Sequence, residues 1–316
     1  MGTGIIVNQL IIFGVLMLVG ASASWLRLIT DDGKDLLARI IIDITLPFLI
    51  LSTFIKLDSN PALLWNGFLV FGLTFVNLGF LFFLGTASSR LQKLNPADNT
   101  VHTLHTMLGN IVFLGFPLFD ALFPGGKGVF YAACYQLASN TITFTYGIYR
   151  LSSGTQKSGL KSLINVNTGA LLLGFTIMVS GLKLPTPVVD AFTGLGKSTS
   201  PLSMVYVGAL LAGIGVKDAF KTLSIYVLSL NKLIITPIVL GVAYFFLNRT
   251  LNLNLSVEAF VVLVMQASMP AQTIVVVMSR RYGGNYKLAA GNLFITTILS
   301  IVTLPLVYIF LTYLIK

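Results

Sequence analysis

Long apolar runs follow one another along almost the whole chain, and they constrain the fold more than any motif does. A run of about 20 mostly apolar residues is what a helix needs to cross the hydrocarbon core of a bilayer. Only 9% of the 316 residues are charged, whereas soluble domains carry roughly 25% charged residues. So few charges cannot cover a water-exposed surface. The sequence therefore predicts an all-α polytopic membrane protein surrounded by the lipid bilayer.

The runs predict ten transmembrane helices. The first run is followed by small residues that resemble a signal-peptidase site, but no basic segment precedes it and it is long enough to span. We therefore expect a retained first helix, and no soluble domain of any size. The predicted helices lie near residues 4–24, 35–56, 62–87, 101–123, 127–150, 164–183, 186–214, 220–247, 256–280 and 286–314.

Most Lys and Arg residues lie in the loops that follow odd-numbered helices. Because cytoplasmic loops carry the excess of Lys and Arg, we expect a multi-pass protein of the cell (plasma or inner) membrane with both termini extracytoplasmic. The net charge of +10 is explained by this pattern, so no nucleic-acid partner is expected. Neither a metal nor another cofactor is expected, since Cys134 stands alone in an apolar run. His102 and His105, three residues apart, are expected to be a solvated pair.

The second half of the chain repeats features of the first half in the same order. The matching pairs are Pro47 and Pro201, Asp43 and Lys197, Pro117 and Pro270, Gly125-Gly126 and Gly283-Gly284, and Ala132-Ala133 and Ala289-Ala290. Five helices per half is an odd number, so the second half must be inverted relative to the first. We predict two inverted five-helix repeats, residues 1–151 and 164–316, with a cytoplasmic linker at 152–163.

Glycine, asparagine, serine and glutamine surround Pro117 and Pro270, which favours interrupted helices over gentle kinks. Proline removes one intrahelical hydrogen bond, and in lipid the freed carbonyls need another partner. An interruption creates a half-helix N-terminus, where carboxylates bind well, and a C-terminus whose carbonyls suit Na⁺ or a proton-carrying water. The alternative is that both prolines only bend packed helices.

Four charged residues within predicted helices are candidates for a role in transport, because a charge at the bilayer centre costs roughly 2.5–3.5 kcal/mol and needs a partner or a proton. Asp43 and Lys197 are expected to pair or to flank the transport pathway, and the alternative is a purely structural ion pair. Asp120 would titrate or hold Na⁺, or else be a protonated helix-capping acid. Lys232 is either buried or extended toward the cytoplasmic end of its helix.

The stretch from Gly109 to Leu118 resembles the helix-four signature of the auxin efflux carrier family. Ser268-Met269-Pro270-Ala271 and Thr303-Leu304-Pro305 are similar to that family as well, and the resemblance covers essentially the whole chain. No long central loop is present, so the prokaryotic-type permease is the closer match. The resemblance implies a crossover at the prolines of helices four and nine. It also implies a scaffold of helices one, two, six and seven, often dimeric, and a mobile transport domain.

The resemblance further implies a secondary transporter, not an enzyme, that moves a small carboxylate such as malate, malonate or an auxin-like acid by elevator-type alternating access. It places the amides of Asn110 and Asn140 at the crossover, where the alternative role is hydrogen bonding between helices. Asp120 departs from the family pattern, because an acid there would repel a carboxylate. The alternative function is a Na⁺-coupled symporter of the bile-acid type, and the possible coupling ions are H⁺ and Na⁺. The candidate substrate-binding residues are Asn110, Pro117, Asn140, Gln266, Ser268, Pro270, Gln272 and Ser52.

Overall fold

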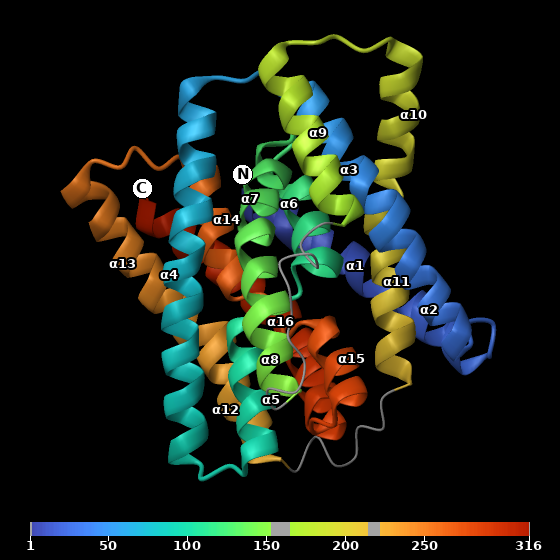
Figure 1. Cartoon of the computed structure of the whole chain (residues 1–316), viewed down its shortest axis with the longest axis vertical. Helices are drawn as coiled ribbons and strands as arrows, with labels where there is room; N and C mark the ends of the chain where they lie inside the picture. Colours follow the sequence, from blue (N-terminus) through green and yellow to red (C-terminus); the bar gives the residue numbers. More distant parts are fainter. Residues whose placement is uncertain (1, 153–164, 214–221, 316) are drawn as a thin grey trace. The chain divides into compact units, whose positions relative to one another are not determined.

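A computed structural model describes residues 2–152, 165–213 and 222–315, and every regular element in these ranges is helical (Figure 1). The predicted linker at 152–163 lies outside the described residues except for Ser152. In the first half the elements, with η marking a π-helical turn, are α1 (Gly2–Trp25), α2 (Asp31–Ile40), η1 (Ile41–Thr45), α3 (Leu46–Lys56), α4 (Pro61–Leu91), α5 (Pro96–Met107), η2 (Ile111–Gly115), α6 (Phe116–Leu122), α7 (Lys127–Ile142), η3 (Thr143–Gly147) and α8 (Ile148–Leu151).

The second half continues with another series of helices, whose bounds confirm the predicted positions to within a few residues. The helix predicted at 256–280, for example, is built as two helices that together span 257–282. The elements are α9 (Val166–Ser180), α10 (Thr186–Lys197), α11 (Thr199–Ala212), α12 (Leu223–Leu230), η6 (Asn231–Ile235), α13 (Thr236–Leu251), α14 (Val257–Ala267), α15 (Thr273–Tyr282) and α16 (Tyr286–Ile315).

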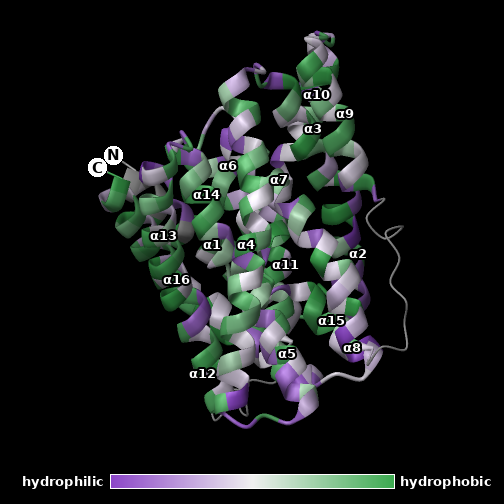
Figure 2. Cartoon of the chain, turned by 60° about the vertical axis from the view of Figure 1, so that its left-hand side comes forward, coloured by the Kyte–Doolittle hydropathy of each residue, from purple (hydrophilic) through white to green (hydrophobic). Residues whose placement is uncertain are grey.

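Several helices are long and apolar enough to cross a membrane. Hydrophobic residues run along many of the helices in Figure 2, with hydrophilic residues gathered near the loops around α5 and α8. Within the described ranges, five spans meet this criterion by length and composition: Val7–Trp25, Asp31–Lys56, Pro61–Leu91, Leu223–Leu251 and Tyr286–Ile315. Shorter apolar helices are Ile111–Leu122, Val166–Ser180 and Val257–Ala267.

Proline bends these helices where a π-helical turn precedes it. Pro47, Pro117 and Pro237 each stand at the second position after such a turn. The N–H of Leu46, which follows η1, bonds to the carbonyl five residues earlier, that of Ile41. This wider turn takes up the strain that a proline ring causes against the preceding turn. The helix interruption expected at Pro117 is therefore misplaced, because that proline lies within a continuous helical run.

The helices group into two compact units. Unit 1 contains α1 to α3, the start of α4, most of η2, α6, the first half of α7, and α9 to α11; unit 2 contains the rest of the described chain. In unit 1, α1 packs along α11 and α3 packs against α9 and α10. Glycine allows the closest of these approaches, since a methyl group on Gly208 would overlap the backbone carbonyl of Met17. The rings of Phe113 and Tyr206 also stack in unit 1, with centroids 4.6 Å apart.

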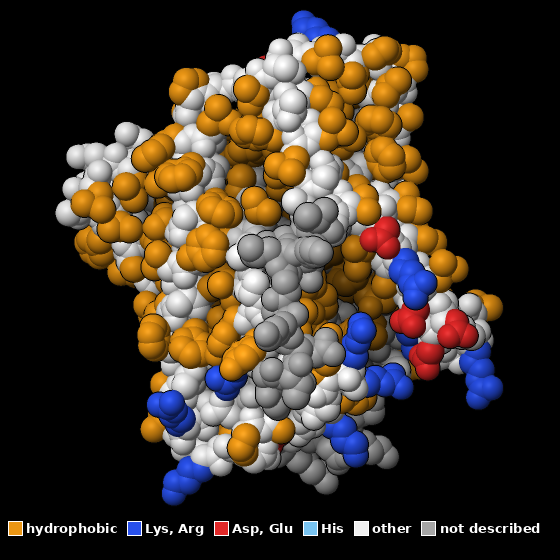
Figure 3. All heavy atoms as spheres, viewed as in Figure 1, with side chains coloured by type: hydrophobic (Ala, Val, Ile, Leu, Met, Phe, Trp, Pro, Cys, Tyr) orange, Lys and Arg blue, Asp and Glu red, His pale blue; other side chains and the backbone are white. Residues whose placement is uncertain are grey.

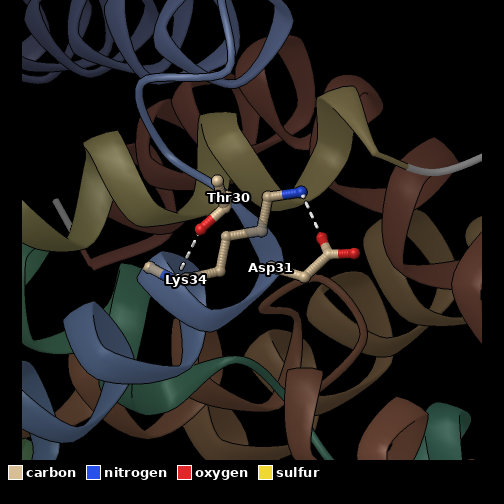
Figure 4. Close-up of polar contacts among 4 residues, drawn as sticks. Thr30, Asp31 and Lys34 are labelled. Carbon is tan, nitrogen blue, oxygen red and sulfur yellow. Dashed lines mark hydrogen bonds and ion pairs between the residues drawn. The ribbon is translucent and has the colours of Figure 1, made fainter.

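The loop before α2 shows how unit 1 ends a span. Thr30 caps α2 by accepting a hydrogen bond from the N–H of Gly33 at 3.3 Å, and Lys34 pairs with Asp31 at 3.0 Å (Figure 4). Capping by a threonine hydroxyl satisfies one N–H of the first turn. Acidic and basic side chains gather over this part of the chain, whereas hydrophobic side chains cover much of the rest of the face drawn in Figure 3. Charge is therefore kept to the end of the apolar span.

In unit 2, α16 is the element around which the others pack. It contacts α5, the α12–η6–α13 segment, α14 and α15. From Ala259 to Ala267, every residue of α14 is buried. A helix that is apolar and buried all round can end abruptly only if its last backbone groups find partners inside the protein.

Candidate functional site

Two helix interruptions meet inside unit 2. The chain is not helical between α5 and η2, at 108–110, and again between α14 and α15, at 268–272. Gly109 and Ala271 form an isolated antiparallel β-bridge, and the N–H of Asn110 donates to the carbonyl of Pro270 at 2.8 Å. The two broken segments therefore cross at their interruptions, and each supplies backbone partners to the other.

A glycine makes this crossing possible. A Cβ atom on Gly109 would lie 3.0 Å from the carbonyl oxygen of Gln266 and 3.0 Å from the Cβ of Met269. Distances that short lie inside normal van der Waals contact. The Gly-Asn pair that marked helix four in the sequence is thus explained by backbone approach, and the interruption lies at this pair and not at Pro117.

The crossing frees a carbonyl at the end of α5, and a lysine binds it. In a continuous helix the N–H of Asn110 would bond to the carbonyl four residues earlier, that of Thr106. Here that N–H bonds to Pro270 instead, and the Nζ of Lys232 donates to the Thr106 carbonyl at 2.9 Å. Lys232 is fully buried. Of the two alternatives for this lysine, burial is the one that the structure shows.

A carbonyl inside α14, one turn before that helix ends at Ala267, also receives a side-chain hydrogen bond. The Nδ2 of Asn77, on α4, donates to the carbonyl of Leu263 at 3.0 Å, and the hydroxyl of Tyr244 donates to the Oδ1 of Asn77. Each first half-helix of the crossing therefore receives a hydrogen bond from a buried side chain of another helix, an amide for α14 and a lysine for α5.

His105 ties the two broken segments to α16. Its Nε2 lies 3.2 Å from the carbonyl oxygen of Gln272, and its Nδ1 lies 3.2 Å from the Nδ2 of Asn292. A carbonyl only accepts, so Nε2 carries the hydrogen and Nδ1 accepts from the amide, which is the neutral form of the ring. The N–H of Ala271 donates to Thr296, also on α16, at 3.0 Å. The crossing is thus fixed by side chains as well as by backbone.

The expectation of a solvated histidine pair is wrong, because both rings are buried. His102 lies between the hydroxyls of Ser88 and Ser224, at 2.9 and 3.0 Å. Among the residues that the structure describes, no group of three or more His, Cys, Asp or Glu side chains is placed to hold a metal ion. In the sequence, the only sign of burial was that the two histidines stand at the start of the predicted helix 101–123. The first turn of a helix can be either solvated or packed, so this position did not decide between the two.

Several buried polar atoms of side-chain amides beside the crossing have no hydrogen-bond partner. Both polar atoms of the Gln266 side chain are in this state, and so are the Oε1 of Gln272 and the Oδ1 of Asn292. Gln266 lies just before one interruption, and Gln272 precedes the first residue of α15. Buried polar groups are almost always paired, so unpaired amides at the ends of two half-helices are suited to a polar guest.

Comparison with known proteins shows the family to which this chain belongs. The model of a family described as membrane transport proteins matches residues 5–158 and 150–308. This chain belongs to that family. The family is the auxin efflux carrier family that the motifs resembled, so the resemblance is confirmed. Its members are membrane transporters and not enzymes, and the apolar helices agree with a multi-pass membrane protein.

Two archaeal relatives of the transporter extend the comparison. An uncharacterized transporter of Methanocaldococcus jannaschii is 28% identical over 305 residues, which cover 92% of this chain and 94% of the relative. An uncharacterized transporter of Methanothermobacter thermautotrophicus is 25% identical over 301 residues, again 92% of this chain and 94% of the relative. The similarity is therefore to whole transporters and not to a shared segment.

The candidate residues of the transporter divide between the two units. Those in unit 2 lie mostly at the crossing, with Lys232 beside it. Asn140 is half-buried on α7 and accepts a hydrogen bond from Gln136 at 2.8 Å. The members in unit 2 are Asn110, Asn140, Gln266, Ser268, Pro270, Gln272 and Lys232, and those in unit 1 are Ser52, Pro117, Asp43, Asp120 and Lys197.

The expected Asp43–Lys197 pair does not form. Both side chains are exposed, and the ion pair found among the described residues joins Lys34 to Asp31. Residues at matching positions of two repeats need not face one another, because each repeat packs its own helices. Asp120, on α6, is half-buried.

Proposed function

We propose that this transporter moves a small organic anion, a carboxylate such as malate, malonate or an auxin-like acid, across the cell membrane. The observation that carries the proposal is the crossing of the two interrupted helices in unit 2. The start of α15 presents N–H groups that have no partner within the helix and a partial positive charge. Such ends bind carboxylates, and the unpaired amides of Gln266 and Gln272 flank this end.

Charge around the crossing supports an anion over a cation. Among the described residues, Lys232 is the one Asp, Glu, Lys or Arg side chain that is fully buried, and it lies beside the crossing. A buried positive charge without a buried carboxylate favours a negatively charged guest.

We propose that the chain spans the membrane ten times as two inverted repeats, with both termini extracytoplasmic. The element order supports this proposal, because the fourth segment (α5, η2, α6) and the ninth (α14, α15) are both interrupted. The third segment binds a carbonyl of the ninth through Asn77, and the eighth binds one of the fourth through Lys232. An inverted repeat would produce this exchange of roles.

We propose that transport follows an elevator mechanism in which unit 2 moves the substrate relative to unit 1. Support comes from unit 1, which contains α1, α2–α3, α9 and α10–α11, the four segments that the family resemblance implies as the scaffold, together with α6 and parts of α4, η2 and α7. We expect two copies of the chain to associate through these scaffold helices.

Counterflow into proteoliposomes tests the function. Vesicles that contain the purified protein are loaded with unlabelled malate, malonate or indole acetate, and uptake of the same labelled anion is followed. We expect saturable uptake of at least one anion, abolished by Gln266→Leu at the crossing and kept by Gln92→Leu in the loop region after α4. Uptake that neither saturates nor exchanges would refute a carrier. Uptake lost when choline replaces Na⁺ would favour the Na⁺-coupled alternative and identify Na⁺ as the coupling ion in place of H⁺.

A further inference from the structure

Lys232 makes a contact that the capping of a helix does not explain. Its Nζ reaches the carbonyl of Thr106, which is the acceptor that the crossing has released. At the end of the opposite half-helix, α14, the carbonyls of Met265 and Gln266 accept hydrogen bonds from the backbone N–H groups of Ser268 and Met269. Neutral donors are therefore sufficient to cap a half-helix in this protein. The long basic side chain at α5 brings a charge in addition to a hydrogen bond.

The position of that charge is one where carriers place a cation. The C-terminal end of a helix carries a partial negative charge, and the carbonyls at the ends of broken helices coordinate Na⁺ or H⁺ in transporters with inverted repeats. Thr106 belongs to the last turn of α5. A cation at this carbonyl would also lie beside the crossing, where we propose that the anion binds.

We infer that the Lys232 side chain is a resident cation at the C-terminal end of α5, standing where a cotransported Na⁺ would otherwise bind. The transporter then carries its anion without Na⁺, because the ammonium group of Lys232 balances the charge of the anion. This group is part of the chain and stays with unit 2 through each transport cycle. The consequence for transport rests on the proposed function, but the occupancy of the α5 end by a cation can be tested without any substrate.

The test is the thermal unfolding of the purified full-length chain at equal ionic strength in sodium, choline or methylammonium chloride. We expect the wild type to unfold at the same temperature in all three salts. Lys232→Ala is expected to unfold about 5 °C lower in choline chloride, because a buried carbonyl loses its partner. Methylammonium should restore most of that loss, since it returns an ammonium group to the vacated space. Choline is too large to do so.

Lys287→Ala is the matched control, because it removes one positive charge from an exposed position on α16. We expect it to unfold as the wild type does in every salt. The inference is overturned if Na⁺ stabilises the wild type over choline, or if methylammonium stabilises Lys232→Ala no more than choline does.

A second variant keeps the inference testable if Lys232→Ala does not fold. Lys232→Met retains the bulk of the side chain and removes the charge. In the malate counterflow assay we expect wild-type uptake to be equal in Na⁺ and choline, and Lys232→Met to reduce uptake at least tenfold. Full uptake by Lys232→Met would overturn the inference. Absence of malate uptake by the wild type would count against the proposed substrate and would leave the unfolding test to decide on Lys232.

Discussion

Gly109→Ala tests whether the two interrupted helices cross where the structure puts them. The added methyl carbon would lie 3.0 Å from the carbonyl oxygen of Gln266 and 3.0 Å from the Cβ of Met269, while carbon atoms pack best about 3.5–4.0 Å apart. The two segments must therefore separate by about 0.5–1 Å. Overpacking of this kind costs roughly 1–3 kcal/mol.

Separation also stretches the hydrogen bond from Asn110 to Pro270, now 2.8 Å long, which is worth about 1 kcal/mol. We expect a total destabilisation of about 2–4 kcal/mol by these two effects. Thermal unfolding of the purified protein measures it, and counterflow measures the loss of transport that a displaced crossing should cause.

Gly79→Ala is the matched control in the same unit. A methyl group there would meet nothing within 4 Å, and alanine is the better helix former by roughly 0.5–1 kcal/mol. We expect Gly79→Ala to be as stable as the wild type or more stable. If Gly109→Ala unfolds at the temperature of Gly79→Ala and transports normally, the close crossing of the two segments is wrong.

Three further changes test other contacts. His105→Phe should lose about 1–3 kcal/mol for each stranded partner, Gln272 and Asn292, and unfolding of the purified variant would show no change if the ring were solvated. Gly208→Ala should lower the free energy of unfolding by more than about 3 kcal/mol, because its methyl group would overlap the Met17 carbonyl. The control is Gly14→Ala in α1, whose methyl group would meet nothing within 4 Å. Equal unfolding temperatures of the two variants would contradict the packing of α1 on α11. Asp43→Asn should not lower stability and should leave counterflow unchanged, since Asp43 and Lys197 are both exposed and form no ion pair; a large loss would reinstate that pair.

Local sequence determined where the helices lie. The run predicted at 62–87 is α4 at Pro61–Leu91, and the run predicted at 286–314 is α16 at Tyr286–Ile315. Apolar runs are a local property, and in lipid each one has little choice but to satisfy its own backbone as a helix. Local sequence also indicated the family, because the family's motifs are short stretches of neighbouring residues.

Where a helix breaks was decided by its surroundings. Pro270 lies in an interruption, whereas Pro117 follows a π-helical turn within a continuous run. The break of helix four is at Gly109-Asn110, because only there does another segment approach closely enough to take over the backbone bonds. Pro117 and Pro270 each remove one hydrogen bond from the helix. Whether the helix then breaks depends on a replacement partner for its backbone, and that partner comes from a distant part of the chain.

The tertiary structure likewise decided which polar side chains are buried and which groups they contact. The sequence by itself placed Lys232 and His105 in predicted helices and predicted that the histidine is solvated. Burial of both depends on helices far away in the chain, which supply Thr106 to the lysine and Asn292 to the histidine. Asp43 and Lys197 occupy matching positions in the two halves, yet both are exposed. Hydropathy reports which residues meet lipid, whereas the pairing of polar groups depends on distances between helices, and only packing sets those.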